Sequence, residues 1–222
     1  MKIKSTIIPV TLAALLLTPA VLQAAGSSSK PQPPEAVTPE QQATVDYNEG
    51  LEHRDRAWEL EEEAAAAMGE KAEKKMAKAR KSYEKAIRSF RAAVRQKPDF
   101  HEAWSSLGYA LRKTGDYEGS LAAYDRALTL DASYVEAIEY RGEAYLGLNR
   151  IEDAKDAYMQ LFRMDRERAA ELMTAMKSWL NERREDAGGV STETIEGFAT
   201  WVEERSELVA QLGVIASVDR SW

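Results

Sequence analysis

Hydrophobic, small and aromatic positions recur with a 34-residue period between positions 101 and 168. Shifting 101–134 onto 135–168 superposes like residues at several offsets: Ala103 on Ala137, Gly108 on Gly142, Tyr124 on Tyr158 and Asp131 on Asp165. A period of this length, with small and aromatic residues at fixed offsets, is typical of stacked helix–turn–helix units. The pattern therefore predicts an all-α fold that contains two such units, 101–134 and 135–168.

The same spacing run backwards finds a third unit. Its second helix carries Ala86 and Phe90, which lie one full period before Ser120 and Tyr124. The small residue lets the two helices of a unit approach, and the aromatic fills the gap to the next unit. Pro98 closes this unit, because proline cannot continue a helix.

The first helix of that unit does not lie where the period places it. Its best match is Gly50, which precedes Gly108 by one period plus 24. Between Thr44 and Lys97 there is no proline, and strong helix formers dominate. We expect two helices, each longer by about a dozen residues, that meet near Gly69 and project ~18 Å.

We expect the projecting hairpin to close along a narrow seam, with Leu60, Ala64, Ala67 and Met68 packed on Ala72, Met76 and Ala79. A solvated projection without a binding role is one interpretation of this charge-rich segment. An arm that contacts a partner or a second copy is the other. One uninterrupted helix is disfavoured, because it would expose the seam to water.

The C-terminal part, 169–213, leaves the period and predicts two capping helices, followed by a tail, 214–222. The first helix carries Leu172, Met173, Met176, Trp179 and Leu180 at helical spacing. After the break at 187–189, Ser191 or Thr192 starts the second helix. Its apolar stripe is Ile195, Phe198, Val202, Val209 and Leu212, with Trp201 beside it. Trp179 and Trp201 are expected to dock the two helices, whereas Trp222 is either an exposed recognition element or frayed.

The N-terminal segment 1–24 has the order of a secretory signal peptide. Lys2 and Lys4 precede a mostly apolar run, and Leu22–Ala24 ends in small residues suited to cleavage. Residues 25–40 form a flexible linker rich in Ser, Pro, Gly and Gln. We expect a bacterial periplasmic or secreted protein. The alternative is an uncleaved segment that anchors the chain in the inner membrane.

Residues 101–134 also carry the signature spacing of a known repeat, at Trp104, Leu107, Gly108, Leu111, Ser120, Tyr124 and Ala127. In these residues the chain resembles the tetratricopeptide-repeat family. The resemblance implies a short right-handed α-solenoid of three units over 41–168, of which the first, 41–100, is elongated. It also implies that the first helix of each unit lines a concave groove that binds a peptide or protein segment.

The family pattern assigns groove positions in all three units: Tyr47 and Arg54 in the first, Glu102, Ser105, Tyr109, Arg112 and Lys113 in the second, and Glu136, Glu139 and Glu143 in the third. Repeats that clamp a C-terminal carboxylate carry Lys and Asn where Ser105 and Tyr109 stand here, so such a clamp is not expected. We expect Arg112 and Lys113 on one wall and the three glutamates on the other, with an aromatic or aliphatic anchor of the ligand near Tyr109.

The expected groove can be tested by substitution. Exchange of Arg112 and Lys113 for glutamate should weaken partner binding without unfolding the protein. The alternative is an inert groove on a stack that binds through its edges or its arm.

Charge and residue types narrow the function. The formal net charge is −7, or −9 without Lys2 and Lys4, which disfavours nucleic acid and anionic lipid as partners. Two histidines, His53 and His101, stand on different units, and the chain has no cysteine. No metal, cofactor or catalytic motif is present.

We therefore expect a non-catalytic scaffold or adaptor in the bacterial cell envelope, with a protein or peptide partner. One alternative is a signal-anchored subunit of an inner-membrane complex that acts through the arm. Another is an enzyme or ligand regulator with a pocket among Trp104, Tyr109 and Tyr145. A stack of barely three units also leaves self-association open.

Overall fold

A computed structural model describes residues 37–218, with side chains described as far as Gln211. Over this range the chain forms eight α-helices and no strand, so the predicted all-α fold class is confirmed. The helices are α1 (Pro39–Ala65), α2 (Glu70–Gln96), α3 (His101–Lys113), α4 (Tyr117–Leu130), α5 (Val135–Gly147), α6 (Ile151–Met164), α7 (Arg166–Glu185) and α8 (Thr192–Val218). The predicted signal peptide, most of the linker and Trp222 lie outside the described residues.

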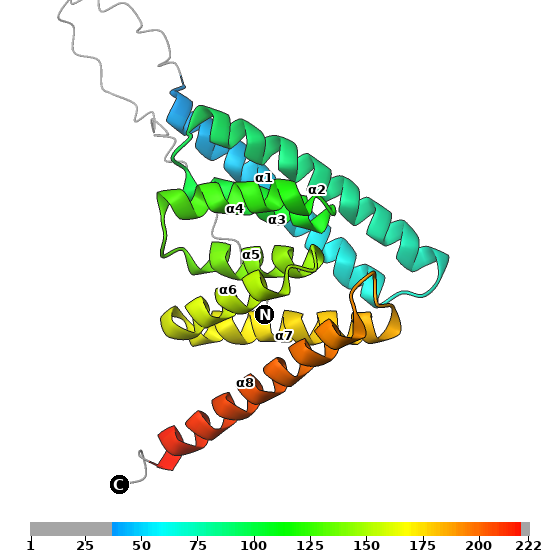
Figure 1. Cartoon of the computed structure of the whole chain (residues 1–222). Coiled ribbons are helices and arrows are strands. Elements are labelled where there is room, and N and C mark those ends of the chain that lie inside the picture. Colours follow the sequence, from blue (N-terminus) through cyan, green and yellow to red (C-terminus); the bar gives the residue numbers. More distant parts are fainter. Residues whose placement is uncertain (1–36, 219–222) are drawn as a thin grey trace, which may run out of the picture. The chain divides into compact units, whose positions relative to one another are not determined.

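The chain divides into two compact units between Phe100 and His101. The first is the hairpin of α1 and α2, and the second contains α3 to α8. Figure 1 shows the helices of both units, coloured along the sequence. Among the described helices, none combines the length and hydropathy that a membrane span requires.

The first unit is the predicted elongated hairpin, with 27 residues in each helix. Thr38 caps α1, because its side chain accepts from the Gln41 N–H while the Gln41 side chain accepts from the Thr38 N–H. The helix therefore begins at Pro39, and the predicted linker ends two residues earlier than expected. Gly69, at φ +55°, precedes α2 and lets the chain reverse.

The base of the hairpin supports the placement of Gly50. A Cβ atom added to Gly50 would lie 2.4 Å from the buried Phe90 ring, so only glycine lets the two helices approach here. In the next unit Gly108 faces Tyr124 in the same way, at 2.6 Å. The two pairs occupy equivalent positions, although Gly50 precedes Gly108 by more than one period.

The distal seam is shorter than predicted. Leu60, Ala64 and Ala79 are buried, but Met68 is 90% exposed and Met76 is 49% exposed. Because α1 ends at Ala65, Met68 lies in the turn and cannot reach the seam. At this end of the hairpin, α1 and α2 are joined by small side chains and by the ion pair between Lys75 and Glu63.

The second unit stacks helical hairpins. α3 packs on α4, α5 packs on α4 and α6, and α7 packs on α5 and α6. The aromatic of each second helix, Tyr124 or Tyr158, is buried in the core. Asp116 and Asp165 cap α4 and α7, accepting N–H bonds from the first turn of each helix. The predicted stack of helix–turn–helix units is thus confirmed.

The capping helices differ from the expectation in their bounds. α7 begins at Arg166 and directly follows α6, whereas the cap was expected from 169. α8 continues as a helix to Val218, past the expected end at 213. Ser191 caps it by accepting from the Thr194 N–H at 3.1 Å.

Trp179 docks the two capping helices as predicted. Its side chain is 5% exposed, its ring meets Phe198 edge to face, and Nε1 donates to the Leu146 carbonyl at 2.9 Å. Trp201 packs edge to face on Tyr158. Of the predicted stripe on α8, Ile195, Phe198 and Val202 are buried and Val209 is 44% exposed, while the side chain of Leu212 lies outside the described ones.

Candidate functional site

The helices that open each hairpin of the second unit form one surface. α5 contacts α3 on one side and α7 on the other. We call the polar surface of these three helices the first-helix face. Eight of the predicted groove residues lie on its helices: Glu102, Ser105, Tyr109, Arg112 and Lys113 on α3, and Glu136, Glu139 and Glu143 on α5.

The other two predicted residues, Tyr47 and Arg54, belong to the first unit. Tyr47 is 7% exposed and packs on the rings of Phe90 and Phe100. It is therefore a core residue of the hairpin, because an aromatic at this position fills the space beside Gly50. Arg54 pairs with Asp55 at 2.9 Å.

Arg112 links α3 to α5. Its Nη1 donates to Glu143 Oε2 at 2.6 Å, and its side chain is only 14% exposed. The guanidinium also lies over the rings of Tyr109 and Tyr140, at 5.2 and 5.7 Å, and those rings meet at 5.1 Å. One cation is therefore held by a carboxylate and two aromatic faces.

This arrangement corrects the expected groove. Arg112 and Glu143 were expected on opposite walls of the groove, but they form an ion pair, since a desolvated charge requires a partner. Burial works to lower the pKa of the Arg112 guanidinium, yet Glu143 and the neighbouring tyrosines raise it above its usual value overall. Arg112 is thus a fixed cation inside the stack, and reversing its charge should affect stability as well as binding.

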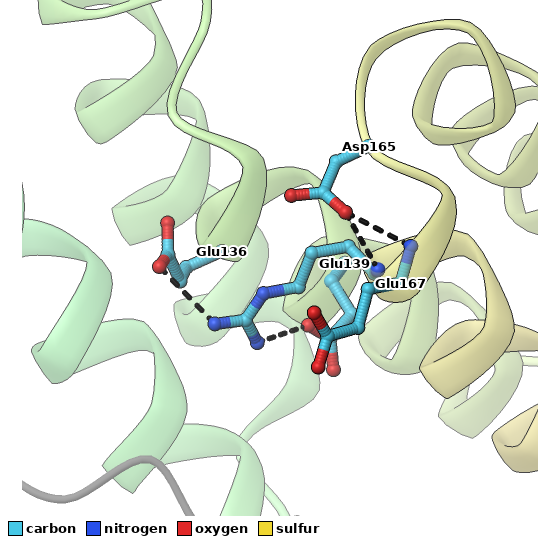
Figure 2. A network of polar contacts seen from close by, with 5 residues as sticks. Glu136, Glu139, Asp165 and Glu167 are labelled. Carbon is cyan, nitrogen blue, oxygen red and sulfur yellow. Dashed lines mark hydrogen bonds and ion pairs between the residues drawn. The ribbon is translucent and has the colours of Figure 1, made fainter.

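Arg168 links α5 to α7 in the same manner. Its Nη1 donates to Glu139 Oε2 at 2.6 Å and its Nη2 to Glu136 Oε1 at 3.1 Å (Figure 2). Asp165 sets the position of Arg168, because its carboxylate accepts the backbone N–H groups of both Glu167 and Arg168 at the start of α7. The helix cap and the ion pair together fix this end of the face.

Glu139 is the most buried acid on the face, at 5% exposure. Burial raises its pKa to about 7, against the pull of the Arg168 hydrogen bond and charge, with Glu143 and Glu171 adding to the rise. Burial likewise raises the pKa of Tyr140 to about 12, and Glu139 adds to that rise. The face therefore holds a carboxyl group that changes charge near neutral pH.

Tyr140 and Arg168 were not predicted from the sequence. The 34-residue spacing places Leu172 at the position of Ile138 and Leu180 at that of Leu146, which marks α7 as a further first helix. Met176 occupies the position where the two preceding units have glycine, so α7 was not predicted to be a further first helix. Tyr140 carries no repeat signal, because the equivalent residue of the preceding unit is Ser106.

Other chemistry in the described residues is sparse. Within 37–218, no three side chains of His, Asp or Glu are arranged to hold a metal ion. His53 approaches Glu49 at 3.7 Å in the first unit, and His101 approaches Glu102 at 3.2 Å in the second. Trp104 and Tyr145, which were considered for a pocket, pack against the buried cluster of Leu121, Tyr124 and Ala137.

Comparison with protein-family models identifies the same repeats that the 34-residue period predicts. Residues 77–135 and residues 141–168 each match a family model described as tetratricopeptide repeat. No curated protein matches the chain.

The chain is also similar to several solved structures. The first repeat domain of Spaghetti (RPAP3) bound to an HSP90 peptide has 20% identity and a TM-score of 0.41, covering 56% of this chain and 94% of its own. The second repeat domain of human RPAP3 with an HSP70 peptide has 19% identity and a TM-score of 0.43, covering 60% and 98%. MamA protein has 20% identity and a TM-score of 0.39, covering 77% and 95%.

The stacked hairpins and the polar face on their first helices define a helical-repeat protein. The two family matches fall on these hairpins and on the end of α2. Over residues 77–135 and 141–168, the chain consists of tetratricopeptide repeats.

Proposed function

We propose that this protein is a non-catalytic scaffold or adaptor that binds a peptide or protein segment on the first-helix face. The observation that carries the proposal is the set of low-exposure charges on that face. Arg112 and Arg168 are each 14% exposed, and Glu139 is 5% exposed. Stacking alone requires only apolar contacts, and buried ion pairs contribute little to stability compared with apolar side chains of the same volume.

The face also keeps capacity for a ligand. The side chains of Glu136 and Glu143 remain 31% and 24% exposed. A carboxylate has more acceptor positions than one guanidinium occupies, so both can accept N–H groups of an extended chain. Tyr109 and Tyr140 are half-buried and lie between the two ion-pair clusters, where they can contact an apolar side chain.

A charge-reversal pair tests the proposal without touching the buried ion pairs. The variant Lys113→Glu reverses a charge at the end of α3 on this face. The control Arg126→Glu makes the same change in charge at an exposed site on the second helix α4. The probe is a peptide selected from a random displayed library on the wild-type protein, with affinity measured by fluorescence anisotropy.

The first variant is expected to weaken peptide affinity by about tenfold or more, and the control by less than about threefold. Equal losses in both variants would show that binding depends on net charge and would overturn the assignment to this face. Failure to enrich any peptide above the unselected library would also count against the proposal.

We further propose that the scaffold acts in the bacterial cell envelope after export. The support is the order of residues 1–24, with Lys2 and Lys4 before an apolar run and small residues at its end. Expression of the full chain in bacteria, followed by intact-mass measurement, should give a protein that begins near residue 25. A full-length mass in the membrane fraction would favour the signal-anchored alternative, in which the α1–α2 arm contacts the partner.

A further inference from the structure

Helix α2 carries a row of cations although the chain as a whole is acidic. Ten Lys or Arg and three Glu give α2 a formal charge of +7, against −7 for the whole chain. Six of these cations follow one another at spacings of three and four residues, and all six are exposed. We call them the basic row: Lys71, Lys74, Lys78, Lys81, Lys85 and Arg88. The net charge of the chain therefore conceals a local excess of positive charge.

The carboxylates of the hairpin leave most of this row without a partner. Lys74 pairs with Glu70 of its own helix at 2.6 Å, and the five other members form no ion pair with the residues that the structure describes. The ion pair that joins α1 to α2 uses Lys75, which is not a member of the row. Like charges three or four residues apart destabilise a helix. The row therefore lowers the stability of α2 unless anionic groups lie against it.

We propose that the basic row binds an acidic α-helix of a partner protein, with carboxylates at the same spacings of three and four residues. The spacing selects a helix. The members of the row recur about every 5.2 Å along α2, and so do side chains at these spacings on a second helix. Side chains on one face of a strand recur about every 6.7 Å. A strand would therefore be a whole position out of register at the end of the row.

Acidic residues on both sides of the row favour a narrow partner. On the side of α1, Asp46 and Glu49 line a recess of about 400 Å³ together with two members of the row. On the opposite side of the row, helical spacing places the exposed Glu73 and Glu84. A bilayer surface is broader than the row and would meet these carboxylates as well. An α-helix, about 10 Å across, can contact the row alone.

The buried rings of α2 also argue for a protein partner. A helix that lies in a membrane surface inserts apolar side chains between the lipids, and proteins that bind single-stranded nucleic acid stack bases on aromatic side chains. The aromatic residues of α2, Tyr83 and Phe90, are fully buried in the hairpin. The exposed row offers charge without such groups, so its ligand must be held through carboxylates.

Fluorescence anisotropy with two synthetic peptides tests the proposal on the purified protein. Both peptides have the same composition of Glu, Ala and Gln, and a hydrocarbon staple holds both helical. The patterned peptide carries its glutamates at spacings of three and four residues, and in the second peptide they are distributed around the helix. The patterned peptide should bind with a dissociation constant on the order of ten micromolar at about 50 mM salt, and the second about tenfold more weakly.

A pair of variants locates the contact on α2. Lys78→Glu/Lys85→Glu reverses two members of the row, and the control Arg80→Glu/Arg91→Glu makes the same change in charge at exposed positions of α2 outside the row. The row variant should bind the patterned peptide about tenfold or more weakly, and the control less than about threefold. Circular dichroism checks that both variants are folded.

Equal affinity for the two peptides, or equal losses in the two variants, would overturn the proposal. Binding to phosphatidylglycerol vesicles or to duplex DNA that only the row variant loses would assign the row to a membrane or to nucleic acid, and would overturn it too. A dimer that only the row variant abolishes would do the same. This contact is separate from the first-helix face, so Lys113→Glu should change the affinity for the patterned peptide by less than about threefold.

Discussion

At the scale of single residues, a glycine opposite an aromatic sets how closely the helices of a hairpin approach. Gly50 faces Phe90 and Gly108 faces Tyr124, and both rings are fully buried. A buried ring cannot move aside, because the close-packed interior leaves no free volume around it. The approach of α3 to α4 therefore depends on the absence of one methyl group.

Replacement of Gly108 by alanine should lower the free energy of unfolding by about 1–3 kcal/mol, since the added Cβ would lie 2.6 Å from the Tyr124 ring. Gly197 is the matched control. A Cβ atom there meets nothing within 4 Å, because Gly197 is an exposed position of α8, so alanine should stabilise by about 0.5–1 kcal/mol. Urea denaturation measures both, and similar effects of the two substitutions would contradict the packing described.

Glu139 gives the second prediction at this scale. Its pKa is about 7 in the folded protein, which lies above the ordinary value of a glutamate. At a pH between these two pKa values, the folded state therefore binds a proton that the unfolded state does not. Its contribution to stability is therefore present at low pH and is lost as the pH rises through 7. Lowering the pH from 8 to 5.5 should stabilise the wild type by up to about 2 kcal/mol through this group.

Glu139→Gln removes the titration but keeps an oxygen that can accept from Arg168. Denaturation at a series of pH values should show a flatter dependence for this variant between pH 5.5 and 8. If both proteins show the same slope, Glu139 is not the group that takes up the proton.

Much of this residue-level arrangement follows from the sequence, and some does not. The repeat spacing predicted that Gly108 and Tyr124 occupy fixed positions of the unit, but it assigned Tyr124 to the gap between units, whereas the ring faces Gly108 in its own hairpin. It did not predict that Met68 is exposed, because the exposure depends on where α1 ends. Nor did it predict that Tyr47 is a core residue, because a first-helix position can turn toward the neighbouring helix of its own hairpin.

At the scale of helices, ion pairs join the first helices side by side. Arg112 connects α3 to α5, and Arg168 connects α5 to α7. Spacing along one chain places residues at equivalent positions of successive helices, but it does not show which side chains reach across. The pairing of Arg112 with Glu143, 31 residues apart, could therefore not be read from the period alone.

The two adjacent cations of α3 should respond differently to charge reversal. Arg112→Glu would place a carboxylate beside Glu143 at low exposure and should cost about 3–5 kcal/mol of the free energy of unfolding. Lys113→Glu, which leaves both ion-pair clusters intact, should change it by less than about 1 kcal/mol. Urea denaturation of both variants is the test, and an equal cost would contradict the burial of the Arg112 pair.

At the scale of the whole molecule, the chain combines an elongated hairpin with a short stack closed by two helices. The number and order of the helices were predicted, because helix formers, breaks and the 34-residue period are local signals. The continuation of α8 to Val218 was not, since Gly213 is a weak helix breaker when apolar residues follow it. The proposed binding face lies within the second unit, on helices that this unit alone supplies.

The central claim is that the first-helix face receives a peptide segment. The most direct measurement is amide chemical-shift mapping by NMR, with a library-selected peptide added to ¹⁵N-labelled protein. We expect the changes to concentrate on α3, α5 and α7, around Tyr109, Glu143 and Arg168. Changes concentrated on α1 and α2, or on the distal half of α8, would contradict it.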